Sequence, residues 1–336
     1  MRASGLVSAV MVTYRTGPAL FGAIDAVRGQ AGLAELVLVD NGNPEPVRAT
    51  LKRLEASEDR VRLLTGHGNV GYAAACNLGA GAARGDYLLF VNPDCLLPAG
   101  AIAQFLAVAR RTPRPAVLGC RLSNPDGTEQ RGSRREALTP RTGLVEALRL
   151  DRLAPDNPRI VRLNQHDRPA PEEVADVPVV SGACLFLAAR DFQALDGFDE
   201  GYFLHVDDID FCFRMRKAGG RVLFLPQVRP VHYRSTSRAH PVFVEWCKTR
   251  GFLRYFRKNF SDSHSRFVIL LTNLAVCLRF VVRAGWLTLR GLLRRDVPGD
   301  SQRRARGQGL KAPGVAGDGV SGKDLVGPSS TTGRSV

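Results

Sequence analysis

The chain has 336 residues, of which 44% are hydrophobic, and its lysines and arginines exceed its acids by fifteen. This length and apolar content can bury a full core and exclude a typical single small domain, so we expect one large domain with an appendage. The positive charge favours a polyanionic partner, either nucleic acid, anionic lipid or a phosphorylated substrate. The seven cysteines stand singly, with no C-x-x-C pair, and no secretory signal opens the sequence. We therefore expect reduced, buried thiols in a cytoplasmic protein.

From residue 6 to about 121, short apolar runs alternate with segments of helical character. Near-continuous apolar strands separated by helices predict a parallel sheet covered on both faces, an α/β fold. The predicted strands are "LVSAVMVT", "ELVLVD", "RVRLLT", "DYLLFVN" and "PAVLGC".

Residues 122–176 are rich in Arg, Pro, Asp and Asn, with little periodicity, and we expect a long, partly mobile surface excursion there. Order returns with "DVPVVSGACLFLAARDF" and continues to "RVLFLP", which ends at Pro226.

After residue 240 the sequence becomes basic and aromatic, first in "VEWCKTRGFLRYFRKNF" and then in the apolar segment 266–295. The longest uncharged run of that segment, Phe267 to Leu278, is shorter than the roughly twenty residues of a spanning helix. Arginines interrupt the segment, which favours helices lying in an anionic membrane surface; a helical pair packed on the domain is the alternative. The tail 296–336 is predicted to be disordered.

The sequence "GHGNVG", from Gly66 to Gly71, has the spacing of a dinucleotide-binding loop. It follows the third predicted strand rather than the first, which disfavours a Rossmann cofactor site. We interpret its glycines as permitting a tight turn and a close backbone approach to a ligand.

Polar residues follow three of the predicted strands, and ligands of open α/β sheets bind at such carboxyl ends. They are Thr13, Tyr14, Asp40, Asn41, Asn92 and Asp94. Asn92 and Asp94 offer oxygen ligands for a hard cation such as Mg²⁺ or Mn²⁺, which would in turn bind phosphate. His232 ends another strand and is a further candidate ligand, although a lone histidine is more often structural.

The segment "GYFLHVDDIDFCFRMRKAGGRVLFLP" places three carboxylates among aromatic residues. Helix capping by Asp207 and an ion pair between Asp210 and Arg214 would explain two of them. Neither interaction explains Asp208.

The ordered set "VSAVMVTYR", "LVLVDNGN", "GNVGYAAACNLG", "GDYLLFVNPDC", "VSGACLFLAARDF", the aspartate cluster and "VHY" resembles the inverting family-2 glycosyltransferases, in particular bacterial rhamnosyltransferases that build cell-surface polysaccharides. The resemblance runs from about residue 6 to 260. It implies a GT-A fold, a nucleotide-sugar donor, and Mg²⁺ or Mn²⁺.

By that resemblance, Thr13, Tyr14 and Asp40 would hold the base and ribose, and Asn69 and Gly71 would line the donor site. "NPD" would be a variant of the D-x-D motif, with Asn92 beside the donor and Asp94 on the metal and diphosphate. Asp208 takes the position of the general base, Asp207 that of an acceptor-side acid, and His232 that of a histidine completing the metal site. Two features depart from the family pattern: "NGNPEP" follows Asp40 in place of a serine and an acid, and Asp207 is one methylene shorter than the usual glutamate.

The sequence therefore predicts a GT-A domain over 1–240, with a nucleotide-binding half at 1–121 and an acceptor half at 177–240. Membrane-associating helices follow at 241–295. We expect a metal-dependent inverting glycosyltransferase on the inner face of the cell membrane. It would transfer a sugar, with rhamnose as a candidate, to a lipid-linked or polysaccharide acceptor and would bind no nucleic acid. The alternatives are a basic nucleic-acid-binding protein and a sugar nucleotidyltransferase of related fold.

Overall fold

The computed structural model describes residues 5–153, 157, 160–234, 236–237 and 239–295. By its contacts the chain divides into two units, Met1–Thr288 and Leu289–Val336. The predicted disordered tail lies outside the described residues.

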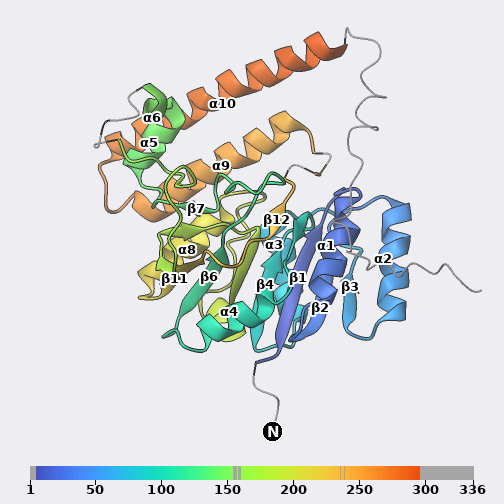
Figure 1. The fold of residues 1–336 in the computed structure, drawn as a ribbon. Helices are drawn as coiled ribbons and strands as arrows, with labels where there is room; N and C mark the ends of the chain where they lie inside the picture. Colours follow the sequence, from blue (N-terminus) through green and yellow to red (C-terminus); the bar gives the residue numbers. More distant parts are fainter. Residues whose placement is uncertain (1–4, 154–156, 158–159, 235, 238, 296–336) are drawn as a thin grey trace, which may run out of the picture. The chain divides into compact units, whose positions relative to one another are not determined.

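An eight-stranded sheet forms the centre of the first unit, in the order β3-β2-β1-β4-β10-β6-β11-β8 (Figure 1). Strands β1 to β4, which are parallel neighbours, confirm the predicted α/β pattern. Strand β10 runs antiparallel between β4 and β6, so the sheet is mixed. The strands of this sheet are β1 (Val7–Thr13), β2 (Leu33–Asp40), β3 (Val61–Leu64), β4 (Tyr87–Val91), β6 (Ala116–Cys120), β8 (Ala175–Asp176), β10 (Cys184–Ala188) and β11 (Arg221–Leu225).

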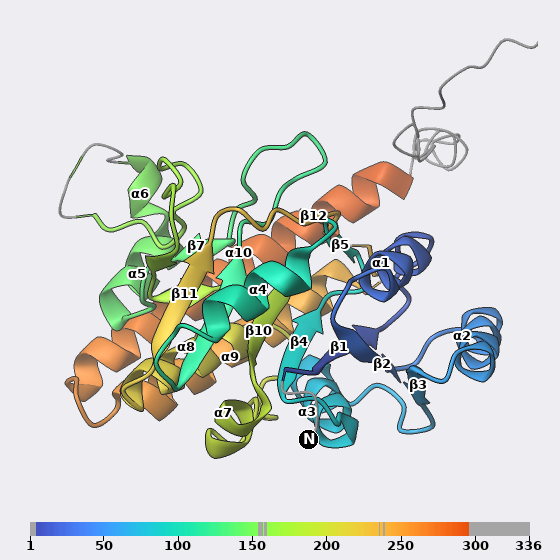
Figure 2. The same cartoon turned by 60° about the horizontal axis from the view of Figure 1, so that its bottom comes forward.

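Helices cover both faces of the sheet because its central strands are apolar on both sides. One face packs against α1 (Ala19–Arg28), α2 (Glu45–Ser57) and α4 (Ala101–Ala109). The other packs against α3 (Tyr72–Ala82), α7 (Ala189–Ala194), α8 (Asp207–Lys217) and α9 (Pro241–Phe260). Figure 2 shows α4 in front of β10, with α9 behind it.

The segment 122–176 is more ordered than its composition predicts. It contains β7 (Arg134–Arg135), α5 (Pro140–Leu148), α6 (Leu150–Leu153) and β8. Strand β7 pairs with β9 (Val179–Val180), and a second small sheet joins β5 (Cys95–Leu96) to β12 (Val231–His232). Ser133 and Arg134 are buried, so the segment contributes to the interior as well as forming the surface excursion that its composition predicts.

The two C-terminal helices differ in how they pack. Helix α9 buries Phe252, Tyr255 and Phe256 in the core, as expected of a helix packed on the domain. Helix α10 (Arg266–Arg295) leaves most of its large apolar side chains exposed. Cys277, on α10, is also exposed, in contrast to the expectation of buried thiols; the other six cysteines are buried.

Candidate active site

The turn after β4 brings Asp94 to His232. Asp94 Oδ1 lies 3.1 Å from His232 Nε2, and Thr236 Oγ1 donates to Asp94 Oδ2 at 2.9 Å. Burial raises the pKa of the Asp94 carboxyl, but the hydrogen bonds and charge of His232 and the bond from Thr236 outweigh it, so the net pKa is lowered. The sequence prediction that these two residues share a site agrees with this geometry.

The tautomer of His232 follows from Gln130. The Gln130 amide nitrogen donates to His232 O at 2.8 Å and to Asn124 Oδ1 at 3.1 Å, so Gln130 Oε1 faces the ring and accepts from His232 Nδ1 at 2.6 Å. With Nδ1 protonated, Nε2 either carries the second proton of the imidazolium, which bonds to Asp94, or turns a lone pair toward the Asp94 carboxylate and is repelled by it. A proton or a cation between the two atoms relieves that repulsion, and a carbonyl behind a metal-binding histidine is a common arrangement.

These residues fit a divalent cation that draws its remaining ligands from the donor. Carboxylate and imidazole are suitable ligands for Mn²⁺, and Asn92, whose side chain lies 3.4 Å from His232 Nε2, borders the same place. In the described part of the chain, no group of three or more His, Cys, Asp or Glu side chains could hold a metal. Phosphate oxygens and water would therefore have to complete the coordination.

Asp40 closes the loop after β2. Its Oδ1 accepts from Asn43 N and Nδ2, both at 2.8 Å, and its Oδ2 accepts from Thr65 Oγ1 at 3.0 Å. Burial raises the pKa of Asp40, but these bonds outweigh it and lower the net pKa. Asn43 also donates to Thr13 Oγ1 at 2.6 Å, and Thr13 is fully buried. In this structure Asp40 and Thr13 shape the loop, and their contact with a donor stays a prediction.

Tyr14 and Asn69 lie near the same loop. Tyr14 is half-buried, and its ring would contact a Cβ at Gly42. Asn69 is exposed; its Oδ1 accepts from Asn41 Nδ2 at 2.9 Å and from Gly71 N at 3.2 Å. These side chains border the carboxyl edge where the sequence predicts the donor.

Gly71 provides a close backbone approach, but to the protein itself. Its φ is +90°, and a Cβ there would lie 2.7 Å from Phe203 O. The next residue, Tyr72, donates its N–H to the same oxygen at 2.7 Å. At Gly71 the close approach is thus made by the loop that leads to α8, and a place for Gly71 in the donor site stays a prediction.

Asp207 and Asp208 begin α8 after a strained turn. His205 and Val206 have φ values of +66° and +71°, which are unfavourable for any residue with a Cβ and most of all for a β-branched one. Val206 occupies the N-cap position, where no side-chain bond caps the helix. Capping by Asp207, expected from the sequence, is therefore wrong.

Asp208 is held by three donors. Arg135 Nη2 and Gly182 N, the latter at 2.9 Å, bind its Oδ2, and Ile209 N donates to Oδ1 at 2.8 Å. A Cβ on Gly182 would lie 3.1 Å from Asp208 Cβ, so glycine permits this approach. Asn92 N donates to Ala183 O at 2.9 Å, which brings the turn containing Asp94 beside the loop that holds Asp208.

The two neighbouring carboxyls differ in charge preference. Burial, followed by the charge of Asp208, raises the pKa of Asp207, which is 4% exposed and lies near Tyr72 and Cys76. Burial also raises the pKa of Asp208, but the charge of Arg135 and the Gly182 bond outweigh it and lower the net value. At neutral pH Asp208 is ionised and Asp207 favours the protonated form, a division typical of paired catalytic acids.

Asp210 has a structural environment. Its side chain is fully buried and bonds to Arg214, Lys258, Asn259 and Tyr202, at distances from 2.8 to 3.1 Å. The predicted pair with Arg214 is confirmed.

Sequence reasoning missed Asn43, Gln130, Arg135 and Thr236. Asn43 lies in the "NGNP" turn and could have been suspected. Gln130 and Arg135 come from the aperiodic segment, and only the fold brings them to His232 and Asp208.

Comparison with known proteins defines the class. The profile described as "Glycosyl transferase family 2" matches residues 8–169. An N-acetylglucosaminyl-diphospho-decaprenol L-rhamnosyltransferase from Mycobacterium tuberculosis is 31% identical over 250 residues, covering 68% of this chain and 76% of the relative. The Escherichia coli rhamnosyltransferase WbbL is 38% identical over 53 residues, 16% of this chain and 20% of its own.

Two solved structures share the fold. GalNAc-T7 with UDP, GalNAc and Mn²⁺ has a TM-score of 0.56 at 17% identity, over 76% of this chain and 48% of its own. The Pyrobaculum calidifontis mannosyltransferase PcManGT, with GDP-Man and Mn²⁺, has a TM-score of 0.53 at 14% identity, over 91% and 80%. The protein is a glycosyltransferase of GT-A fold. It belongs to glycosyltransferase family 2 and is similar to rhamnosyltransferases of that family.

Proposed function

We propose that the protein transfers rhamnose from a nucleotide sugar to a lipid-linked N-acetylglucosamine, with inversion at the anomeric carbon and with the help of a divalent cation. The mycobacterial relative, an N-acetylglucosaminyl-diphospho-decaprenol L-rhamnosyltransferase, supports the substrate class. The observation that carries the chemistry is the pair of neighbouring carboxyls at the start of α8, where the pKa of Asp207 is raised and that of Asp208 is lowered. The pair is held beside the turn that contains Asp94.

The reaction would be a single displacement. The acceptor oxygen forms a bond to the anomeric carbon while the bond from that carbon to the donor phosphate breaks. The acceptor hydroxyl gives its proton to Asp208, and the nucleoside diphosphate leaves with the electron pair. One displacement inverts the configuration and needs no covalent enzyme intermediate.

Asp208 suits the role of base because it is ionised at neutral pH. For proton transfer one of its oxygens must face the acceptor, and Arg135 with Gly182 fixes the other. Asp207 is almost fully buried, so little of it is open to an acceptor, and its acceptor-side role stays a prediction.

Asp94 and His232 would hold the cation, with Asn92 beside it. When bound, the cation neutralises charge on the departing diphosphate. The Mn²⁺ in the two solved structures supports this assignment.

The exposed apolar surface of helix α10 supports association with a membrane, and we propose that the protein lies on the cytoplasmic face. Residues Arg266–Leu293 form the one helix in the described part of the chain that is long and apolar enough to cross a bilayer by length and composition. Only 17% of its most apolar window is buried, which suits either spanning or lying in the surface. The exposed apolar residues of its part in the first unit are Phe267, Leu270, Leu271, Leu274, Leu278, Val281, Val282 and Trp286.

The Asp208→Asn variant tests the proposal. It keeps shape and polarity but removes the proton acceptor, so acceptor-dependent release of nucleoside diphosphate should fall about 10²-fold or more. Donor affinity, measured by titration of the nucleotide sugar, should change little. Near-normal turnover would remove Asp208 from the role of base. Release of inorganic diphosphate in place of nucleoside diphosphate would favour the nucleotidyltransferase alternative.

A further inference from the structure

Lys248 on α9 is a half-buried cation without a close partner. Its Nζ lies 5.9 Å from the centre of the Phe252 ring and makes no hydrogen bond or ion pair with any residue that the structure describes. Burial, followed by the charge of Arg279, lowers the pKa of Lys248 to about 8. In this half-buried position the ammonium has no counter-ion among the described residues, and a bound anion would supply one.

The charges around Lys248 leave room for an anion. Glu245 pairs with Arg279 and Arg283, each at 3.1 Å, and Glu146 pairs with Arg131 at 2.8 Å. The glutamates and arginines are thus already engaged with each other, and Lys248 adds to an excess of positive charge. One further nitrogen, Arg279 Nη1, is buried with no hydrogen-bond partner in the described residues.

On α9, Lys248 lies between a residue that packs on the strained turn His205–Val206 and a residue that pairs with α10. On α9 it shares a face with Gly251, three residues on, where a Cβ would approach Val206 Cγ2 to 2.9 Å. His205 is within electrostatic range of both Lys248 and Asp208. In the other direction along the same face, Glu245 binds α10 through its two arginines.

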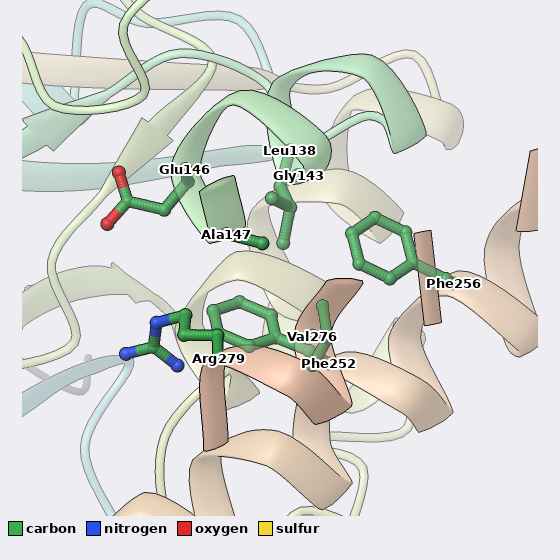
Figure 3. A pocket seen from close by; sticks show the side chains of 8 residues that line it. All are labelled: Leu138, Gly143, Glu146, Ala147, Phe252, Phe256, Val276 and Arg279. Carbon is green, nitrogen blue, oxygen red and sulfur yellow. The ribbon is translucent and has the colours of Figure 1, made fainter. Parts of the chain in front are cut away.

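Apolar surface begins beside this charged group. Figure 3 shows a small cavity between α5, α9 and α10, with Phe252, Phe256 and Val276 in its wall and with Glu146 and Arg279 at one side. The exposed apolar residues of α10 follow. Lys248, which has no counter-ion among the described residues, thus lies near both the turn that precedes Asp208 and apolar surface. A lipid-linked acceptor has parts suited to each of these: a sugar hydroxyl, a diphosphate and a hydrocarbon chain.

We propose that Lys248, supported by Arg279, binds the diphosphate of a lipid-linked acceptor and so delivers its sugar to Asp208. The proposal rests on the function proposed above and adds a specific site to it. Its chemistry, a phosphate group on a lipid, is shared with anionic head groups, and the experiment has to separate the two sources.

Binding of farnesyl diphosphate by the full-length protein tests the site without turnover. We expect Lys248→Gln to weaken this binding about tenfold or more, since a charged hydrogen bond is lost, while Lys248→Arg should retain most of it. The matched control is Arg250→Gln, which removes an equal charge from an exposed position on α9 and should have little effect. Equal affinities for wild type and Lys248→Gln, at unchanged melting temperature, would overturn the proposal.

Two further arms separate the possible failures. Sedimentation with phosphatidylglycerol vesicles should be nearly the same for wild type and Lys248→Gln; a loss confined to vesicles would assign the site to head groups and overturn the proposal. In a transfer assay, KM for a prenyl-diphosphate-linked N-acetylglucosamine should rise about tenfold, while KM for octyl N-acetylglucosaminide should not. If wild type binds farnesyl diphosphate through Lys248 but transfers no sugar, the proposed function fails and the anion site stands.

Discussion

The buried carboxylate Asp210 provides a sharp test of which aspartates of α8 serve stability and which serve catalysis. Asp210→Asn keeps the size of the side chain and removes its charge. In the structure this charge faces Arg214 Nε at 2.8 Å and Lys258 Nζ at 3.0 Å, with no exposed surface. Removing one partner of a buried ion pair costs about 3–5 kcal/mol of folding free energy.

The surroundings place the expected loss near the lower end of that range. Arg214 keeps its bond to Gly197 O at 2.7 Å, and Lys258 keeps Asp199 at 2.7 Å. The asparagine can still accept from Tyr202. We therefore expect a loss of about 3 kcal/mol, which at about 2–4 °C per kcal/mol lowers the melting temperature by roughly 6–12 °C.

Thermal unfolding followed by circular dichroism measures the effect, and turnover per folded molecule at low temperature should stay near that of wild type. Asp176→Asn is the control, because Asp176 pairs with Arg216 and Arg221 at the surface and should contribute less than about 1 kcal/mol. An unchanged melting temperature in Asp210→Asn would refute the argument from burial. A loss of turnover at unchanged stability would assign Asp210 to catalysis.

Three further predictions concern the site and the membrane. Arg135→Met removes the cation that keeps the pKa of Asp208 low, so the acid limb of the pH–rate profile should move to higher pH, while Arg135→Lys should restore it in part; an unmoved limb would contradict the role given to Arg135. Asp94→Asn should weaken donor binding and turnover together, and chelator should reproduce this in wild type; full activity in excess chelator would exclude the cation. Replacing Leu274, Leu278 and Val281 by glutamine should lower affinity for anionic vesicles more than about tenfold at unchanged melting temperature, because these exposed side chains would be buried in lipid; unchanged sedimentation would exclude this face.

The fold could be predicted where hydrophobic pattern alone decides it. The apolar runs that became β1, β2, β3, β4 and β6 were visible because parallel strands buried on both faces need no polar positions. The direction of β10 was not visible, since an apolar strand reads alike in either orientation. The regular structure within the segment 122–176 was also hidden, because its buried residues Ser133 and Arg134 are polar. They gain their partners, Leu122 N and the Glu129 carboxylate, only after folding.

The candidate site was predictable as a list of residues but not as a network. Asp208 stood out because ordinary helix chemistry left it unexplained, and the structure gives it a partner, Arg135, that lies 73 positions away in the chain. His232 and Gln130 are 102 positions apart. Such pairs carry no local signal, since neither spacing nor composition relates residues that meet only once the chain has folded.

The helix α9 packs against the strained turn His205–Val206 and also carries Lys248, the residue proposed to bind an anion. Left-handed conformations at His205 and Val206 cost on the order of 1–3 kcal/mol each and persist only where packing over-determines them. Val206 is 2% exposed and fits against Gly251, where a side chain would displace it. The face of α9 that stabilises the turn therefore also carries Lys248, one helical turn before Gly251. The contact between Gly251 and Val206 therefore links the position of Lys248 on α9 to the turn that precedes the carboxyl pair of α8.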